Sequence, residues 1–345
     1  MLSFECDYNN GAHPKVLQHL VSTNGQTSLT YGADEWSDSA KRKIREACGI
    51  PDADIFFLSG GTQTNATVID SLLDSCEAVV TAECGHINVH EAGAIEASGH
   101  RVIALPATDG KLAPETLEHF MEVFENDESR DHMAQPGMVY ITIPTEFGTL
   151  YSAEEINAIH QLCRRHHLHL YIDGARLGYG LMSSECDFSL PWLARHCDAF
   201  YIGGTKIGAL CGEAVVFTRH HMPRHFFSNV KRHGALLAKG RLTGVQFDAL
   251  FTDNLYFDIA RHANLMAEKL RQVLNEAGLD FYIDSPTNQQ FVLMPVEQAH
   301  ALKKQVDFTL WGPSDDNRVI CRFVTSWATT EKDIRKLREI LKGKR

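Results

Sequence analysis

The sequence predicts an α/β protein in which a mostly parallel sheet carries helices on both faces and is followed by a smaller α+β domain. Short apolar runs alternate with helical segments between about residues 55 and 220. Strands separated by helices pair in parallel, because the chain crosses over the sheet before adding the next strand. From about residue 248 the pattern changes to one long helix followed by strands. We therefore expect a large domain over residues 1–247, including an N-terminal segment, and a small domain over residues 248–345.

The individual elements follow from apolar runs of strand length and from apolar residues at helical spacing. We expect strands at Ile55–Leu58, Ala78–Thr81, Arg101–Leu105, Val139–Ile143, Leu168–Ile172, Ala199–Ile202 and Ala214–Thr218. We expect helices between them at Thr64–Asp74, His90–Ala97, Ala113–Phe124, Ala153–His166 and Leu190–Arg195. The small domain is expected to contain a helix at Asp248–Ala277, strands at Phe281–Asp284, Gln290–Pro295 and Val319–Phe323, and a closing helix at Glu331–Leu341.

The composition narrows the possible partners and location. The formal net charge is -11, whereas binding to a phosphate backbone requires clustered Lys and Arg, so no nucleic acid is expected. No run of about 18 apolar residues occurs, so no membrane span is expected, and residues 1–10 lack the basic and then apolar pattern of a signal peptide. The 9 cysteines form no CxxC pair. This usage is typical of reduced thiols and predicts a cytoplasmic protein.

The first motif that carries chemistry is the segment Ser59–Asn65, which follows a strand and opens a helix. Its glycines let backbone amides approach an anion, and the start of a helix favours negative charge. The segment is not a P-loop, because no Gly-Lys-Ser/Thr follows. Taken alone, it predicts either a phosphate site or an ordinary glycine-rich turn.

Two further motifs follow strands. In Tyr171–Arg176 the strand ends at Asp173, which suits either a helix N-cap or a partner for a protonated pyridine nitrogen. In Tyr201–Lys206 a glycine pair precedes a lysine. A lysine in a cleft forms Schiff bases, although most single lysines are solvated surface groups. Asp173 and Lys206 are one βαβ unit apart, so both are expected at the same sheet edge. An anion turn, an acid and a lysine in this order indicate pyridoxal 5'-phosphate.

The residues resemble those of the threonine aldolase and aromatic amino acid β-eliminating lyase family, which has the fold-type-I, aspartate-aminotransferase-like fold. The similarity covers nearly the whole chain. Its most specific part is the pair Asp173–Arg176 and Gly204–Lys206, in that order. The other matching stretches are Asp7, Tyr31-Gly32, Gly61–Asn65, Gly85-His86, Glu91–Gly93 and Arg322–Thr325.

The resemblance implies a set of cofactor contacts. Lys206 forms the Schiff base, Asp173 pairs with the pyridine nitrogen and His86 stacks on the ring. Phosphate contacts are implied for Gly61, Thr62 and, more weakly, Thr205, together with Lys231 and Arg232 from a second subunit. Because the family builds its site between subunits, we expect a homodimer or homotetramer.

The resemblance also implies an activity, which is cleavage of the Cα–Cβ bond of a β-hydroxy-α-amino acid such as L-threonine or L-allo-threonine to glycine and an aldehyde. Arg176 and Arg322 are implied to hold the cofactor or the substrate carboxylate, with Arg176 a candidate for both, and His86 or Glu146 is the implied base. Two positions depart from the family, because Cys6 replaces a substrate-binding Ser and Glu146 stands where a second His is common. These departures leave the substrate open.

Three alternatives remain from the sequence. β-Elimination from an aromatic or other β-substituted amino acid, or transamination, would use the same scaffold, and the fold does not separate these reactions. A non-catalytic cofactor-binding module is the third. His86 and His90 have the i, i+4 spacing of metal ligands, but a third ligand is not evident, so no metal site is expected.

Overall fold

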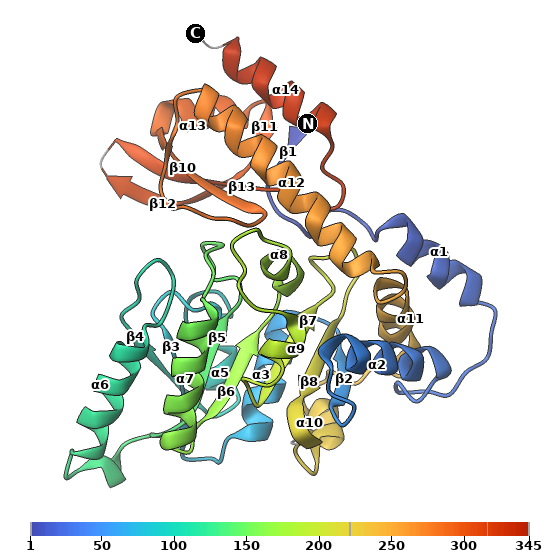
Figure 1. The fold of residues 1–345 in the computed structure, drawn as a ribbon, viewed down its shortest axis with the longest axis vertical. Coiled ribbons are helices and arrows are strands. Elements are labelled where there is room, and N and C mark those ends of the chain that lie inside the picture. Colours follow the sequence, from blue (N-terminus) through green and yellow to red (C-terminus); the bar gives the residue numbers. More distant parts are fainter. Residues whose placement is uncertain (1, 221, 316, 344–345) are drawn as a thin grey trace.

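The computed structural model describes residues 2–220, 222–315 and 317–343. Within these residues, a seven-stranded sheet forms the centre of a large α/β part. A smaller part with the C-terminal strands lies above one end of these strands (Figure 1). The strand order in the large sheet is β2-β8-β7-β6-β5-β3-β4. Its strands are β2 (Asp54–Leu58), β3 (Glu77–Ala82), β4 (Arg101–Leu105), β5 (Gln135–Thr142), β6 (His169–Asp173), β7 (Ala199–Gly203) and β8 (Glu213–Phe217).

The pairing in this sheet confirms the predicted mostly parallel arrangement. The pairs β3–β4, β3–β5, β5–β6 and β6–β7 are parallel. Strand β8 is antiparallel to both β7 and β2. A turn at residues 204–212, and no crossover helix, leads from β7 to β8, so the chain returns in the opposite direction. This turn carries Lys206.

Helices cover both faces of the sheet, as predicted. Alternate residues of β6 point to opposite faces, because Leu170 and Ile172 belong to one buried cluster and Tyr171 to another. The helices that contribute to the first cluster include α2 (Glu35–Cys48), α6 (Pro114–Glu125), α7 (Ala153–Arg165), α8 (Leu177–Leu181), α9 (Leu190–Leu193) and α11 (Arg241–Leu250). The helices of the second are α3 (Gly61–Leu72), α4 (His86–Val89), α5 (Ala94–Ala97) and α10 (Phe226–Arg232).

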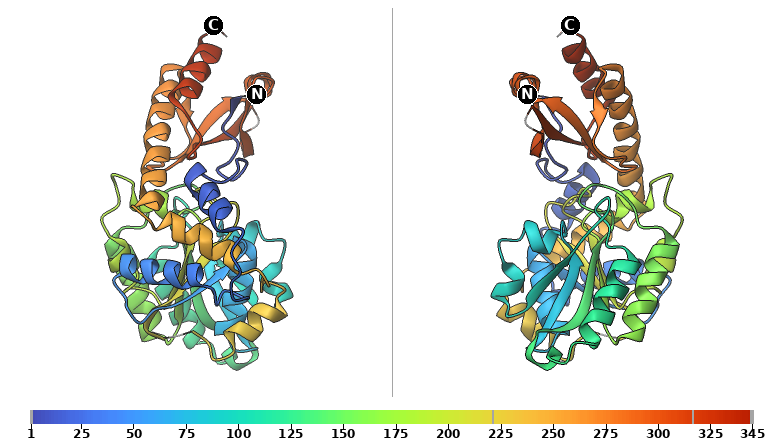
Figure 2. Two further views of the ribbon diagram at one scale, coloured as in Figure 1. Left: turned by 90° about the vertical axis from the view of Figure 1, so that its right-hand side faces the viewer. Right: turned by 90° about the vertical axis from the view of Figure 1, so that its left-hand side faces the viewer.

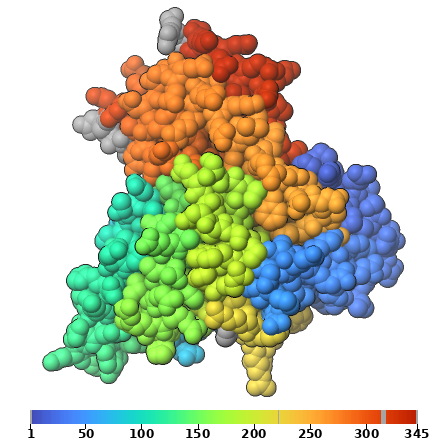
Figure 3. All heavy atoms as spheres, in the orientation of Figure 1, coloured from blue at the N-terminus to red at the C-terminus, as the bar shows by residue number. Residues whose placement is uncertain are grey.

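The smaller part is an antiparallel sheet with helices packed on it. Its strand order is β12-β13-β10-β9. The elements are α12 (Leu255–Glu276), β9 (Asp280–Phe281), β10 (Gln289–Pro295), α13 (Val296–Lys303), β11 (Val306–Asp307), β12 (Thr309–Asp315), β13 (Arg318–Val324) and α14 (Glu331–Lys342). Figure 3 shows this smaller part resting on the larger one.

Two predicted helices are wrong in extent, for the same physical reason. The predicted helix Asp248–Ala277 is divided into α11 and α12, because Asp253 and Asn254 have φ angles of 52° and 59°. The left-handed region cannot continue a right-handed helix. Likewise, the predicted helix His90–Ala97 is helical only in α5 (Ala94–Ala97), since residues 92 and 93 have positive φ angles.

The N-terminal segment joins the two parts of the molecule. Strand β1 (Leu2–Ser3) pairs in parallel with β11, and Leu2 and Phe4 pack in the buried cluster of the small part. Figure 2 shows the N-terminus beside the upper sheet and α12 running between the two parts. Helix α1 (Pro14–Thr23) then lies against α11. The division into domains between residues 247 and 248 stays a prediction. None of the described helices is long and apolar enough to cross a membrane.

Candidate active site

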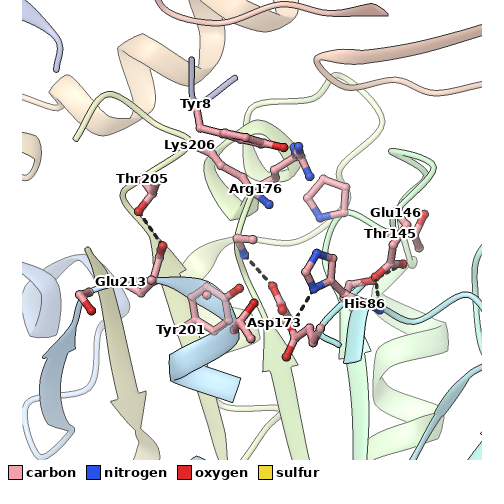
Figure 4. A pocket seen from close by; sticks show the side chains of 18 residues that line it. Tyr8, His86, Thr145, Glu146, Asp173, Arg176, Tyr201, Thr205, Lys206 and Glu213 are labelled. Atoms are coloured by element: carbon pink, nitrogen blue, oxygen red, sulfur yellow. Dashed lines mark hydrogen bonds and ion pairs between the residues drawn. The ribbon is translucent and has the colours of Figure 1, made fainter. Parts of the chain in front are cut away.

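A cavity of about 290 Å³ opens at the carboxyl ends of β5, β6 and β7 (Figure 4). The three sequence motifs meet in its wall, because parallel strands end at the same edge of the sheet. Eight of the candidate residues line it, namely Gly61, Thr62, His86, Glu146, Asp173, Arg176, Thr205 and Lys206. Cys6, Lys231, Arg232 and Arg322 are not among the described residues that line the cavity.

Lys206 lies in the turn after β7, with its ammonium nitrogen 5.9 Å from the ring centroid of Tyr8. Burial and then the Arg176 guanidinium lower the pKa of Lys206. The carboxylates of Asp7, Asp173 and Glu213 act in the opposite direction on this pKa without cancelling the shift. A lysine with a lowered pKa supplies a free amine more readily, which is what Schiff-base chemistry needs.

Asp173 is a buried carboxylate at the end of β6. Its Oδ2 accepts hydrogen bonds from Asn65 Nδ2 at 2.9 Å and from the Tyr140 hydroxyl at 2.6 Å, and its Oδ1 accepts one from the Ala175 amide at 2.9 Å. Burial alone would raise the pKa of Asp173, but the charge of His86 and these side-chain hydrogen bonds lower it. Asp173 is therefore held as an anion facing the cavity.

The wall near Asp173 also contains a helix N-terminus. Helix α3 begins at Gly61, and its N-cap Gly60 makes no side-chain capping hydrogen bond. Positive ends of helices favour anions such as phosphate. Gly174 is required for close packing here, because a Cβ atom at this position would overlap the carbonyl oxygen of Tyr201.

Glu146 and His86 lie next to each other in another part of the cavity wall. Glu146 Oε1 accepts a hydrogen bond from the His86 backbone amide at 2.8 Å, and its Oε2 accepts one from the Thr142 hydroxyl at 3.0 Å. Burial raises the pKa of Glu146 to about 7. Nδ1 of His86 lies 2.7 Å from Oε1 of the buried Glu91. Glu146 is thus placed to exchange a proton near neutral pH, beside a His86 ring that Glu91 holds in position.

Arg176 is held by Asp7 in a two-point ion pair. Its Nε and Nη2 donate to the Asp7 carboxylate at 2.8 and 2.9 Å. Asn288 donates a third hydrogen bond to Asp7 at 2.9 Å. Burial opposes ionisation of Asp7, but the charge and hydrogen bonds of Arg176 lower its pKa. The N-terminal segment therefore fixes the orientation of Arg176 in the cavity wall.

Arg322 lies on β13 beside the cavity and is 8% exposed. Its guanidinium stacks on Trp311, with the Cζ atom 4.5 Å from the ring centroid, and its Nη2 donates to Thr309 at 3.2 Å. Its Nε has no hydrogen-bond partner among the described residues. Burial, and then Arg176, lower the pKa of Arg322, so the two cations are close enough to interact. Burial also raises the pKa of Cys6, whose thiol therefore stays protonated.

The two basic residues of α10 lie elsewhere. Arg232 pairs with Asp70 at the surface, and Lys231 Nζ is 5.4 Å from the ring centroid of Tyr31. Both were expected to act in a second subunit, and that role stays a prediction.

Sequence reasoning gave no individual role to several residues of the wall, among them Tyr8, Ser59, Glu91, Tyr201 and Glu213, although Ser59, Glu91 and Tyr201 lie in its motifs. Glu213 opens β8 directly before an apolar run, and the predicted strand began one residue too late to include it. An acidic residue at the start of an otherwise apolar strand was the available signal. The described residues hold no group of three or more His, Cys, Asp or Glu arranged for a metal ion.

These groups fit pyridoxal phosphate: a partly buried lysine with a lowered pKa, an anionic aspartate for the pyridine nitrogen and an uncapped helix start for the phosphate. The fold and the site together define a pyridoxal-phosphate enzyme of the fold-type-I class.

Comparison with known proteins narrows this class. The model of the beta-eliminating lyase family matches residues 19–297. The chain is 29% identical to a low-specificity L-threonine aldolase of a Pseudomonas species, over 97% of this chain and 95% of that one. It is also similar to the structure of Leishmania major threonine aldolase, with 40% identity, a TM-score of 0.95 and coverage of 99% of both chains. Thermus thermophilus aspartate aminotransferase, at 15% identity, shares the fold, with a TM-score of 0.70 over 99% of this chain and 91% of that one. The chain belongs to the beta-eliminating lyase family of pyridoxal-phosphate enzymes.

Proposed function

We propose that this enzyme cleaves the Cα–Cβ bond of a β-hydroxy-α-amino acid such as L-threonine or L-allo-threonine, releasing glycine and an aldehyde. The observation that carries the proposal is that the partly buried Lys206, the anionic Asp173 and the proton-exchanging Glu146 line one cavity. The similarity to threonine aldolases over nearly the whole chain supports the choice of reaction.

Lys206 holds the cofactor covalently in this proposal, Asp173 pairs with its pyridine nitrogen and the start of α3 receives its phosphate. His86 lies against its ring. The cofactor supplies an electron sink at the reacting carbon. Asp173 supports this chemistry because its lowered pKa keeps a negative charge opposite the pyridine nitrogen.

Arg322 is the better placed of the two candidate carboxylate ligands. The Asp7 carboxylate already neutralises Arg176 and binds two of its nitrogens, whereas Arg322 has the uncharged partners Gln289 and Thr309 and its Nε has no partner among the described residues. A guanidinium binds a carboxylate through two parallel hydrogen bonds, which orients the substrate. We assign Arg176 to holding the cofactor side of the site and Arg322 to the substrate carboxylate, with Cys6 as a weak neighbouring donor.

Glu146 takes the proton from the β-hydroxyl group in this proposal. Its pKa of about 7 provides both a deprotonated base and a driving force for proton transfer near neutral pH. His86 is the second candidate, because Glu91 orients its ring and leaves Nε2 for other partners.

We propose a homo-oligomer, at least a dimer, in the cytoplasm. Supporting this, Leu29, Tyr31 and Phe227 are exposed apolar side chains, and the rings of Tyr31 and Phe227 lie 6.5 Å apart beside Lys231. Light scattering is expected to give a mass of at least two chains. Phe227→Asp should reduce that mass and weaken cofactor binding if Lys231 and Arg232 serve the neighbouring site.

Product analysis tests the reaction. The purified holoenzyme should release glycine and acetaldehyde from L-threonine or L-allo-threonine, and glycine and benzaldehyde from phenylserine. Release of ammonia and a keto acid from a β-substituted amino acid, with no aldehyde from any β-hydroxy amino acid, would instead establish elimination and refute the proposal.

A further inference from the structure

Glu213 is a buried carboxyl group that the proposed reaction does not use. It is the first residue of β8, lies opposite Gly203 of β7, is 4% exposed and lines the cavity. A buried carboxyl is costly unless hydrogen bonds or a counter-ion compensate. In the described part of the chain no cationic side chain forms a salt bridge with Glu213, so hydrogen bonds and a raised pKa compensate for its burial.

Those hydrogen bonds come from the two residues directly before Lys206. The Gly204 amide donates to Glu213 Oε2 at 3.0 Å, and the Thr205 hydroxyl donates to Oε1 at 2.8 Å. The Gly212 amide in turn donates to the Thr205 oxygen at 3.0 Å. On the other side, the Tyr179 hydroxyl donates to the Lys206 carbonyl oxygen at 2.5 Å. The turn that carries the lysine is therefore fixed from both sides, and the Glu213 side chain supports one of them.

Glu213 also interacts with Lys206 through its charge. Burial raises the pKa of Glu213 to about 8, although the Thr205 hydrogen bond and the charge of Lys206 oppose the shift. Asp173 on β6 adds a repulsive charge. Its charge also acts on the phenols of Tyr171, Tyr201 and Tyr256, which stay protonated because burial raises their pKa values.

We infer that Glu213 is a positioning residue for Lys206, which fixes the lysine-bearing turn and sets the proton affinity of the lysine nitrogen by changing its own charge. This inference rests on the proposed function, in which Lys206 holds the cofactor. A carboxyl to which the proposed reaction gives no step thereby influences the reactive nitrogen.

The test is a pH titration of the visible absorption band of the holoenzyme. An ionised Glu213 favours the protonated form of the lysine nitrogen, so Glu213→Gln, which cannot ionise, should lower the pH midpoint of the band. Glu118→Gln, which removes a surface carboxylate paired with Arg165, should leave the midpoint unchanged. A Glu213→Gln midpoint equal to that of the parent would overturn the inference.

Two Thr205 variants give a second measurement that does not depend on how well Glu213→Gln folds. Thr205→Ser retains the hydroxyl donor and should titrate like the parent. Thr205→Val removes the donor, which raises the proton affinity of Glu213. The pH midpoint of the absorption band should therefore be displaced in this variant. Equal midpoints in both variants would contradict the inference.

Reduction of the holoenzyme with borohydride, followed by peptide mapping, separates this inference from the proposed function. A cofactor label on Lys206 together with an unchanged Glu213→Gln titration refutes only the role of Glu213. A label on another lysine refutes the assignment of Lys206 as well. A label on Lys206 with a lowered midpoint supports both.

Discussion

Replacing Glu146 with Gln tests the assignment of the base most directly. The amide keeps the size of the side chain and can still accept the hydrogen bond from the His86 backbone amide and meet the Thr142 hydroxyl. What it loses is the ability to take a proton. Because a general base contributes roughly 10²–10⁴-fold, kcat/KM for L-threonine should fall by about that factor at pH 8.

The pH profile gives a second, independent magnitude. With a pKa of about 7, Glu146 is about one-tenth deprotonated at pH 6 and about nine-tenths deprotonated at pH 8. The parent kcat/KM should therefore rise about tenfold between these pH values, whereas the Glu146→Gln profile should lose this rise. The defect of the variant should consequently be about ten times smaller at pH 6 than at pH 8.

The assay is coupled detection of acetaldehyde across the pH range, with cofactor content measured on each preparation. Glu146→Gln should retain full cofactor, since the proposal places Glu146 on the substrate side. His86→Ala leaves the backbone hydrogen bond to Glu146 in place, so the two substitutions separate the candidate bases. A Glu146→Gln enzyme that loses less than about tenfold in rate and keeps the parent pH profile would refute Glu146 as the base.

Three further substitutions alter residues that support or line the active site. Asp7→Asn leaves the buried Arg176 without its counter-ion, so the free energy of unfolding should fall by about 3–5 kcal/mol in denaturant titrations. Because the pKa of Asp7 is lowered in the folded state, the stabilisation is present above its ordinary value of 3.8 and is lost as the pH falls through the folded-state value. In Asp7→Asn this part of the acid dependence should be missing. Gly174→Ala forces a Cβ atom onto the Tyr201 carbonyl oxygen and should cost about 1–3 kcal/mol, measured by thermal unfolding; a stable variant would show that the turn can move. Asp173→Asn removes the anion facing the pyridine nitrogen, so turnover should be lost and the cofactor dissociation constant should increase; unchanged turnover would exclude this role.

The strand-end residues were the predictable part of the site. Asp173 and Lys206 each follow an apolar run, and parallel strands bring such positions to the same edge. The break between α11 and α12 was not predictable from periodicity. The positive φ angles at Asp253 and Asn254 interrupt the helix, but the helical spacing of apolar residues continues across it. Asp and Asn adopt this conformation more readily than most residues, which was the only local signal.

The contacts of Arg176 could not be predicted from the sequence for a different reason. Its carboxylate partner Asp7 is 169 residues away in sequence, and neither periodicity nor local propensity reports on pairing over that distance. The same holds for Glu213, whose function depends on an antiparallel return of the chain that places it beside Gly203. Residues that contact the reacting groups can be found from motifs, whereas residues that hold those groups in place depend on tertiary structure.

The pairing of β1 with β11 has a consequence for the order of folding. Glu5 accepts a hydrogen bond from Thr309, 304 residues further along the chain, and Asp7 lies only two residues after Glu5. During synthesis the segment that orients Arg176 therefore leaves the ribosome long before the strands that hold it. Contacts so distant in sequence form late, because closing the intervening loop costs entropy before any contact compensates. The nascent chain can assemble the central sheet first, but the cavity acquires its final wall only after the C-terminal strands have been made.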